Sequence, residues 1–577
     1  MITNRATPAT AVYDGSGRKP PAKGPRHGAP MVASRRRLLG WVVLILLGLA
    51  GAFSLVHHLS RVDDPAKAQE NLVRFLMMAF PLDFPPMADL LRAIGLTLGL
   101  TLCGTFLAAV LSVPLAYLGA ASTSPGTASR FGARALGVLA RAVPDYVMAI
   151  ALVLLFSIGT LPGAVALGLH SVGMLSRQFA DAIEDLDQGP LNALRASGAG
   201  RFQQFFTGAV PAVIPAWAAS FLHRNDINLR QSVILGYAGV VGLGQDLAYA
   251  LRSLDYPRAM ALTCVLFLLC LLMESLSAAL RQRLLGGVPS HTGGSRHRER
   301  RVPAAKAGQV RAVSVTTMLR RSWDRDRIST NLWLGSAVLA LVTAVVLADF
   351  RWRDLIEVWG RIPDFVATAF PPSFGRYGGG DMIDAMGETI TIALAATTLS
   401  VLLGTVVGAL AASNVAPGPV VRWTCRGTLV AVRAVPEIIL AITLIVATGL
   451  GTQAGVLALG IAGLALLGRF VADSLEDLPR GPQLAVTAVG GSRLQVVAAV
   501  TVPLAIPSTV GHVLYLLDHN LRSATLLGIV GGGGMGYYLN DATRIGDYSL
   551  VGAILSMVVA AVLVVEGISV LLRWALR

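Results

Sequence analysis

Charged residues are scarce in this chain of 577 residues: they make up 14% of it, while hydrophobic residues make up 54% and the mean hydropathy is +0.63. That balance excludes an ordinary soluble domain. Cysteine is also rare, and every cysteine falls in or beside an apolar stretch, which argues against a disulfide framework or a cysteine metal site. The four cysteines are Cys103, Cys264, Cys270 and Cys425.

Sequence patterns typical of enzymes are missing as well. The chain contains no Gly-Lys dipeptide and therefore no Walker A phosphate loop, so any ATP that drives it, together with Mg²⁺, must be bound by another chain. The nine histidines form no repeated cluster and show no metalloprotease spacing. No polar stretch reaches the roughly 50 residues of a small folded domain. We expect no catalytic residue, no metal and no cofactor in this chain.

Long apolar stretches are the main positive feature. A bilayer is spanned by about 20 helical residues, and we predict an all-α polytopic membrane protein with six spans in each half. The fourth and fifth stretches of each half are interrupted by Gly or Pro, and the first begins too far along the chain for a cleavable signal peptide. The stretches lie near 38–57, 91–119, 134–158, 160–176, 206–224 and 258–280, then near 331–349, 385–412, 425–450, 452–467, 498–517 and 549–572.

The chain repeats itself at an offset of 292 residues. Residues 189–244 align with 481–536 without a gap, and 21 of the 56 positions are identical. The repeated positions include specific anchors, such as the motif Asp-x-Asn-Leu-Arg at 226–230 and 518–522. A membrane chain built from two direct copies has its working part on the axis between them, which favours a transport function.

Basic residues are concentrated in two polar segments. The N-tail over 1–37 carries eight basic residues and one acid, and residues 281–327 carry twelve basic residues and three acids. Because positive segments next to spans stay on the cytoplasmic side, both are placed in the cytoplasm of a cell-membrane protein, with an even number of spans between them. Nucleic-acid binding by these tails is the less favoured alternative. The expected units are an N-tail at 1–37, halves at 38–283 and 331–577, and a basic linker at 284–330.

Two further segments lie outside the spans. Around Phe80-Pro81 and Phe370-Pro371 we expect amphipathic helices at the outer interface. The connection between the fourth and fifth spans, on the cytoplasmic side, has Gly-Pro to break one helix and start another, and a Gly eight residues later to end it. We predict a short helix across the membrane surface, repeated in both halves, although a plain turn between spans is the simpler alternative.

This loop resembles the coupling loop of type I ABC importer permeases, whose pattern is Glu-Ala-Ala, three residues, then Gly. With the following Asn-Leu-Arg and Gly-rich run, both halves resemble the phosphonate ABC transporter permease family, as two permease units fused in one chain. The Glu of the pattern is Asn192 in the first copy and Leu484 in the second. The resemblance implies that the coupling loops contact the ATPase through Gly189, Pro190, Ala193, Gly198, Arg201, Gly481, Pro482, Ala485, Gly490 and Arg493. It also implies two copies of an ABC ATPase subunit and one extracytoplasmic binding protein.

Charged residues recur inside the predicted fifth spans, about twenty residues in from the coupling loop. A charge at that depth is costly unless it faces a cavity or a partner, and the fork of donors of arginine suits phosphoryl oxygens. We hypothesise that Arg230 and Arg522 face a central path for an oxyanion, with amide donors from Asn228 and Asn520. Alternatively, each arginine is paired with the acid four residues before it as a clamp within the fold; these acids are Asp226 and Asp518.

The third span also carries a repeated pair of charges, Arg141 with Asp145 and Arg433 with Glu437, next to a proline that we expect to kink the helix. Residues four apart share one helix face, so we predict an ion pair there, which either lines the path or braces the core. Glu274 repeats in the sixth span, where helix packing is favoured. The candidate path residues are therefore Asn228, Arg230, Asn520, Arg522, Asp226, Asp518, Arg141 and Arg433.

A glycine-rich run follows each fifth span. Glycines permit a bend or gate, close packing, or an anion nest made of backbone N–H groups, and we favour the gate or hinge. The glycines are Gly236, Gly239, Gly242 and Gly244, then Gly528, Gly531, Gly534 and Gly536.

The resemblance and the repeat together favour the permease subunit of an ATP-driven importer of phosphonate, phosphate or a similar oxyanion. Three alternatives stay open: a methionine importer permease, because the glycine-rich end of the fifth span also resembles that family; a twelve-helix secondary transporter; and an intramembrane enzyme. The second predicts uptake driven by an ion gradient. The third predicts one polar catalytic cluster, whereas the polar residues here come in pairs across the halves.

Overall fold

The computed structural model describes residues 35–62, 64–285 and 325–576, and these are helical apart from turns and one isolated bridge between Gly159 and Val240. Most of the expected N-tail and of the expected linker lies outside the described residues. Helix α11 continues to Leu285 and α13 begins at Arg325, so both reach into the range assigned to the linker.

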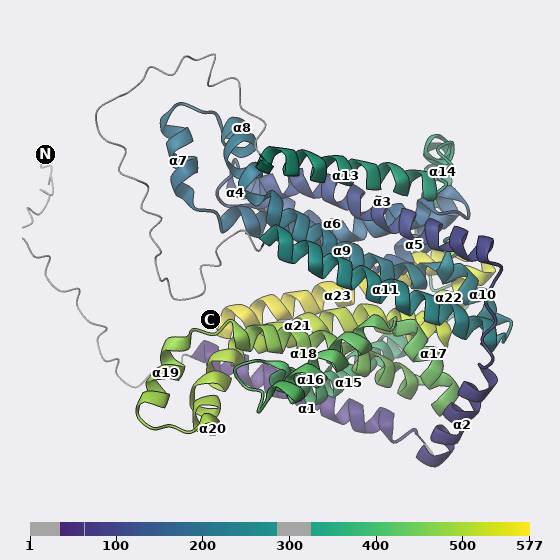
Figure 1. Ribbon diagram of the computed structural model, residues 1–577. Helices are drawn as coiled ribbons and strands as arrows, with labels where there is room; N and C mark the ends of the chain where they lie inside the picture. The colour runs from purple at the N-terminus through teal and green to yellow at the C-terminus, as the bar shows by residue number, and fades with distance from the viewer. Residues whose placement is uncertain (1–34, 63, 286–324, 577) are drawn as a thin grey trace, which may run out of the picture.

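The two halves have matching series of helices (Figure 1). The first half consists of α1 (Arg35–Leu59), α2 (Pro65–Met78), α3 (Met87–Gly119), α4 (Thr127–Ala142), α5 (Asp145–Phe156), α6 (Leu161–Glu184), α7 (Gln188–Ala196), α8 (Arg201–Gln203), the π-helical turn η1 (Gln204–Ala209), α9 (Val210–Tyr237), α10 (Leu243–Arg252) and α11 (Tyr256–Leu285). The second consists of α13 (Arg325–Leu347), α14 (Asp354–Ala369), α15 (Gly379–Ala411), α16 (Pro419–Ala434), α17 (Glu437–Thr448), α18 (Thr452–Glu476), α19 (Arg480–Ala488), α20 (Arg493–Val496), the π-helical turn η2 (Val497–Thr501), α21 (Val502–Leu527), the 3-10 turn η3 (Gly528–Val530), α22 (Met535–Ile545) and α23 (Tyr548–Leu576).

By length and apolarity, 8 helices among the described residues qualify as membrane spans, or up to 10 if each of two bent pairs counts as one span. A helix lies at each of the twelve predicted stretches, but α6 does not reach the threshold and α13 contributes only a shorter apolar part, Gly335–Leu347. The polar residues at the end of α6, where it leads into α7, account for its lower apolarity.

The predicted third span is two helices in each half, not one kinked helix. Helix α4 ends at Ala142 and α5 starts at Asp145, at an angle of 82°; α16 and α17 meet at 88°. Proline disfavours the helical conformation in the residue before it, and Pro144 and Pro436 stand at the two breaks, each directly before the new helix. One continuous helix would place Arg141 and Asp145 on a common face. The break points these two side chains away from each other.

The first helix of each half packs on the opposite half. Helix α1 lies along α15 and α23, and α13 lies along α3 (Figure 1). His58 at the end of α1 is buried and hydrogen-bonded to Thr452 of α18 at 2.8 Å. Gly99 of α3 faces α13 so closely that an added Cβ would lie 2.6 Å from the backbone nitrogen of Ala348. Each half therefore packs its first helix against the other half.

The largest buried apolar cluster extends to the end of the molecule opposite α7 and α19 (Figure 1). There α10 and α22 pack under the beginnings of α3 and α15, and the buried cluster includes Leu243, Leu247, Met535 and Leu539. This apolar plug closes one end of the space between the halves.

Candidate functional site

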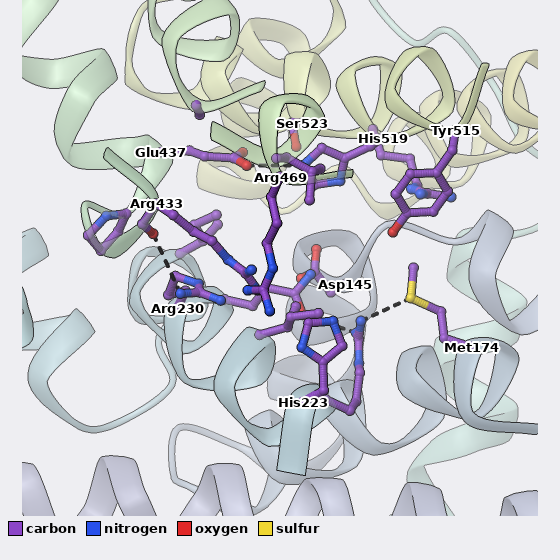
Figure 2. A pocket seen from close by; sticks show the side chains of 18 of the residues that line it. Asp145, Met174, His223, Arg230, Arg433, Glu437, Arg469, Tyr515, His519 and Ser523 are labelled. Carbon is purple, nitrogen blue, oxygen red and sulfur yellow. Dashed lines mark hydrogen bonds and ion pairs between the residues drawn. The ribbon is translucent and has the colours of Figure 1, made fainter. Parts of the chain in front are cut away.

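A cavity of about 360 Å³ lies between the two halves. Its walls come from α5, α6, α9 and α11 on one side and from α16, α17, α18 and α21 on the other (Figure 2). Helices α9 and α21 are repeat counterparts, and positions that correspond at the 292-residue offset face each other across it. The cavity therefore straddles the axis that relates the halves, and it reaches Arg281 and Asp473 toward the end that carries α7 and α19.

The lining of the cavity is rich in cations. Six arginines and three histidines line it, against three acids. The guanidinium group is planar and presents five N–H donors that match carboxylate and phosphoryl oxygens. The arginines are Arg224, Arg230, Arg281, Arg433, Arg469 and Arg522.

Arg230 and Arg522 both line the cavity and both are clamped by an acid. Arg230 Nη2 lies 2.6 Å from Asp226 Oδ2, and Arg522 Nη1 lies 3.0 Å from Asp518 Oδ2. The clamp is therefore present at both arginines, and both also line the cavity; their role in a path for an oxyanion stays a prediction. The acids are 2% exposed and lie behind the arginines, outside the lining. Arg522 Nη2 has no hydrogen-bond partner among the described residues.

Asn228 and Asn520, predicted to offer amide donors to a ligand, are buried away from the cavity. Asn228 Nδ2 donates to Thr105 Oγ1 at 2.9 Å, and Asn520 Nδ2 donates to Thr397 Oγ1 at 2.9 Å. Both partners lie on the third helix of their half, so the amides tie α9 to α3 and α21 to α15. Neither asparagine lines the cavity in this structure, because its helix face packs against a neighbour; a role for them in the path stays a prediction.

The predicted pairs within the third span do not form. Because the chain breaks at Pro144, Arg141 reaches instead to Glu566 of the other half, with Nη2 2.8 Å from Oε2. Arg433 likewise reaches the first half, 3.5 Å from Asp226 and 3.7 Å from Glu274. These arginines bridge the halves, and of the two only Arg433 also lines the cavity.

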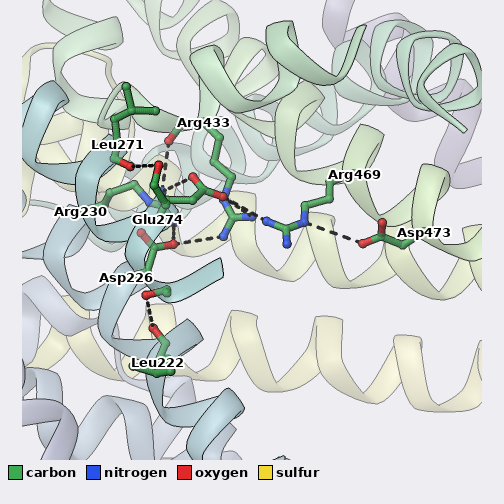
Figure 3. Close-up of polar contacts among 10 residues, drawn as sticks. Leu222, Asp226, Arg230, Leu271, Glu274, Arg433, Arg469 and Asp473 are labelled. Atoms are coloured by element: carbon green, nitrogen blue, oxygen red, sulfur yellow. Dashed lines mark hydrogen bonds and ion pairs between the residues drawn. The ribbon is translucent and has the colours of Figure 1, made fainter. Parts of the chain in front are cut away.

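Glu274 is the centre of a network that crosses between the halves (Figure 3). It lies 3.2 Å from Arg469 and 3.7 Å from both Arg230 and Arg433, and its side chain is 11% exposed. Its repeat counterpart Glu566 pairs with only two arginines, Arg141 and Arg573. The two sides of the cavity therefore carry related but unequal ion networks.

Sequence reasoning missed Arg224 and Arg469 as cavity residues, and it named Asp145 only as a member of the third-span pair. Arg224 has Leu516 as its repeat counterpart, so a search for paired positions passes over it. The usable signal was a lone arginine deep in an apolar span, which by itself marks a functional candidate. His519, which has Ile227 as its repeat counterpart, is hydrogen-bonded to Glu437 at 3.0 Å in the cavity wall.

The expected coupling helices are present as α7 and α19, which stand apart from each other at one end of the molecule (Figure 1). Neither helix has a buried residue. Gly198 and Gly490 follow them with φ of 86° and 88°, the left-handed conformation that ends a helix. Arg201 donates to the carbonyl of Pro125, and Arg493 to that of Ala416. The exposed residues on this surface include Gly189, Pro190, Ala193, Gly481, Pro482 and Ala485.

The glycine-rich runs turn the chain and allow close packing. An added Cβ at Gly236 would lie 2.0 Å from the backbone of Gly244, and one at Gly536 would lie 2.0 Å from the carbonyl of Thr525. The turns have positive φ at Gly239, Gly242, Gly531 and Gly534. Backbone N–H groups here are already bound: Gly534 N donates to Glu388 at 2.8 Å. The run at Gly528 and its counterpart lie outside the cavity lining, so an open anion nest is not formed.

Comparison with known proteins gives a consistent result. The family model described as binding-protein-dependent transport system inner membrane component matches residues 88–286 and 404–577. The phosphate-import permease protein PhnE of Mycolicibacterium smegmatis is 39% identical over 508 residues, covering 87% of this chain and 88% of that protein. The phosphite transport system permease protein PtxC of Stutzerimonas stutzeri is 35% identical over 247 residues, covering 42% of this chain and 89% of its own length.

Among solved structures, the inward-facing methionine ABC transporter MetNI matches 35% of this chain and 100% of its own chain, with 22% identity and a TM-score of 0.33. That likeness is too low to bear on the function.

Proposed function

We propose a function from one premise: the chain belongs to the family of binding-protein-dependent transport system inner membrane components, whose domain it contains twice. It is a multi-pass inner-membrane permease without an ATPase site of its own, and ATP is hydrolysed by partner subunits. The resemblance to fused permease units is thereby confirmed, and the secondary transporter and the intramembrane enzyme are set aside. We propose that its cargo is a phosphorus oxyanion: phosphate, a phosphonate or phosphite.

The observation that carries this proposal is the cavity between the halves, with its six arginines. An oxyanion needs several N–H donors and a positive charge to replace its hydration shell, and guanidinium groups supply the donors. Acids already offset the charge of Arg230, Arg433, Arg469 and Arg522, whereas Arg224 and Arg281 have no carboxylate within 4.0 Å among the described residues. Methionine, a zwitterion with an apolar side chain, would need matched charges and an apolar pocket. The phosphate-import permease PhnE, matched over 87% of this chain, and the phosphite permease PtxC, matched over 89% of its own length, carry phosphate and phosphite in their names, which supports the same class of cargo.

The geometry suggests how transport proceeds. The cavity is closed by the plug around Leu243 and Met535 and reaches Arg281 and Asp473 at the other end. We propose that this other end is cytoplasmic, together with the N-tail and the linker, and that two ATPase copies bind α7 and α19. One extracytoplasmic binding protein would dock over α10 and α22. ATP-driven approach of α7 and α19 would open the plug, and hydrolysis would return the cavity inward.

The proposed assignment of domains follows from this arrangement. Each half, 38–283 and 331–577, supplies one wall of the cavity and one coupling helix, but its first helix packs on the other half. Neither half is expected to be stable alone. The glycine turns beside the plug are proposed as the hinge, because they join α9 to α10 and α21 to α22.

Reconstitution tests the proposal. The full chain, its ATPase and its binding protein are placed in proteoliposomes, and uptake of labelled phosphate, methylphosphonate, phosphite and methionine is measured with and without ATP. We expect ATP-dependent uptake of a phosphorus oxyanion that requires the binding protein. Uptake of methionine alone, or uptake without ATPase subunits, would refute the assignment.

Two variants test the path within that assay. Arg230→Lys and Arg522→Lys keep the charge but lose the fork of donors, so uptake should fall while the complex still assembles. Arg177→Lys is the matched control, because Arg177 lies outside the cavity in an exposed pair with Asp181. Unchanged uptake in both cavity variants would remove these arginines from the path.

A further inference from the structure

The two walls of the cavity differ at Arg224, a cavity arginine whose positive charge has no nearby carboxylate in the described part of the chain. Arg224 is 3% exposed, and its guanidinium is bonded only to neutral groups. Nε donates to Ser171 at 2.8 Å, Nη1 to the sulfur of Met174 at 3.0 Å and Nη2 to Gln231 at 3.1 Å. Among the described residues, no carboxylate lies within 4.0 Å of it. A buried cation without a counter-ion is costly, so this wall offers a place for an anion.

An acid on the same wall also has spare bonding capacity. Asp145 is 4% exposed; Oδ1 accepts from the Tyr146 N–H at 3.0 Å, and Oδ2 has no hydrogen-bond partner within the described chain. Its repeat counterpart Glu437 is bound by His519, but the first half has Ile227 at the position of that histidine. The first half therefore leaves a carboxylate oxygen free where the second half has a satisfied one.

The two groups line one cavity of about 360 Å³ (Figure 2). A ligand that satisfies both must present an anionic oxygen to a guanidinium and an O–H to a carboxylate. The unpartnered Nη2 of Arg522, on the opposite wall, is a further donor for the anionic oxygens. The second half lacks the equivalent pair, because it has Leu516 in place of Arg224.

We propose that Arg224 and Asp145 form one asymmetric site for a singly protonated phosphorus oxyanion, in which Arg224 binds P–O⁻ and Asp145 Oδ2 accepts the hydrogen bond of P–OH. This inference rests on the proposed function and adds to it a basis for distinguishing a protonated phosphorus oxyanion from sulfate. Phosphate and phosphonates carry such a proton near neutral pH, whereas sulfate is a tetrahedral dianion without one. The site binds one ligand per fused chain and discriminates by the presence of the O–H.

Sulfate is the deciding probe. The complete complex of this chain with its ATPase, without the binding protein, is purified, and binding of labelled phosphate is measured with unlabelled phosphate or sulfate as competitor. A site built to hydrogen-bond an O–H rejects an analogue that lacks it by a factor on the order of 10⁴, so sulfate should barely compete. Sulfate competing within about tenfold of phosphate, a difference of only about 1.4 kcal/mol, overturns the inference.

Three variants assign the roles. Asp145→Asn replaces the accepting carboxylate oxygen with an N–H donor. The affinity for sulfate relative to that for phosphate should therefore rise by roughly thirtyfold or more. Asp145→Glu keeps the carboxylate, as the second half does at Glu437, and should preserve the rejection of sulfate. Arg224→Leu, which introduces the residue found at the counterpart position Leu516, should weaken the binding of phosphate and of sulfate by the same factor. Asp181→Asn and Arg177→Leu are the controls, with the same substitutions in an exposed pair outside the cavity.

The outcomes separate this inference from the proposed function. If the wild-type complex takes up no phosphorus oxyanion, the function fails. If uptake is normal and Asp145→Asn leaves the ratio of phosphate to sulfate unchanged, only the asymmetric site fails. If Asp145→Asn does not assemble, Asp145→Glu and Arg224→Leu still decide, because sulfate binding by Asp145→Glu would contradict the assigned role.

Discussion

Asn228 and Asn520 occupy the same position in the two repeats, and replacing each with alanine distinguishes a role in the fold from a role in the path. Asn520 has one hydrogen bond to a side chain, to Thr397, whose hydroxyl also donates to the Ala393 carbonyl. Asn228 has two, because Ser171 donates to its Oδ1 at 3.0 Å while its own Nδ2 donates to Thr105.

The magnitudes follow from these contacts. Each buried hydrogen bond contributes about 0.5–1.5 kcal/mol, and a buried polar group left without a partner costs about 1–3 kcal/mol. Asn520→Ala leaves Thr397 satisfied as a donor, so we expect a loss of about 1–2 kcal/mol in stability. Asn228→Ala removes two bonds and leaves Ser171 to reorient, so we expect a loss of about 2–4 kcal/mol.

The two variants should also differ in function. Ser171 accepts from Arg224 Nε, so Asn228→Ala disturbs the support of an arginine that lines the cavity. Asn520→Ala has no such connection, because Leu516 stands at the position of Arg224. The assay combines thermal unfolding of the purified complex with uptake per folded complex in proteoliposomes. If Asn520→Ala abolishes uptake while its thermal midpoint is unchanged, the asparagine contacts the cargo and the reasoning is refuted.

Three further perturbations have defined outcomes. Arg141→Leu leaves Glu566, whose side chain is 16% exposed, with Arg573 at 3.7 Å in place of its 2.8 Å partner, and should destabilise the complex by about 1.5–3 kcal/mol in thermal unfolding, whereas the double variant with Glu566→Leu should recover much of that loss. Gly490→Ala, at φ 88° with open space around it, should strain the loop by about 1–2 kcal/mol and lower stimulated ATP hydrolysis without changing phosphate binding in the same complex. Hydrogen bonds from Tyr377 and then Arg376 lower the pKa of Asp541 below its ordinary value of 3.8. The contact therefore stabilises the surface around α22 above that value and is lost as pH falls through the lowered pKa, and Asp541→Asn should flatten the acid limb of the thermal midpoint.

Local patterns in the sequence predicted much of the fold. The apolar stretches locate the helices, and the Gly-Pro and later Gly of each coupling loop coincide with the start and end of α7 and α19. The prolines at 144 and 436 marked the third spans as irregular, but the sequence could not distinguish a kink from a break of 82° or 88°. That difference depends on what the two pieces pack against, which no local pattern contains.

The site was only partly accessible from sequence. Searching for residues paired across the repeat found Arg230, Arg433 and Arg522, which line the cavity. The same search favoured Asn228, which is bound to Thr105 behind the wall. It passed over Arg224, because a residue present in one copy only gives no signal in a comparison of copies.

The sequence by itself determined that this is a membrane permease of two repeated units. Helix-forming stretches, turn residues and a repeat can all be recognised from the order of residues along the chain. Only the tertiary structure decided that α1 and α13 cross to the opposite half, that Arg141 pairs with Glu566, and that Asp145 and Arg224 face a common cavity. The physical reason is that a charge buried in a membrane protein takes its partner from whichever helix packs against it. The packing of so many similar helices is settled by contacts between residues hundreds of positions apart.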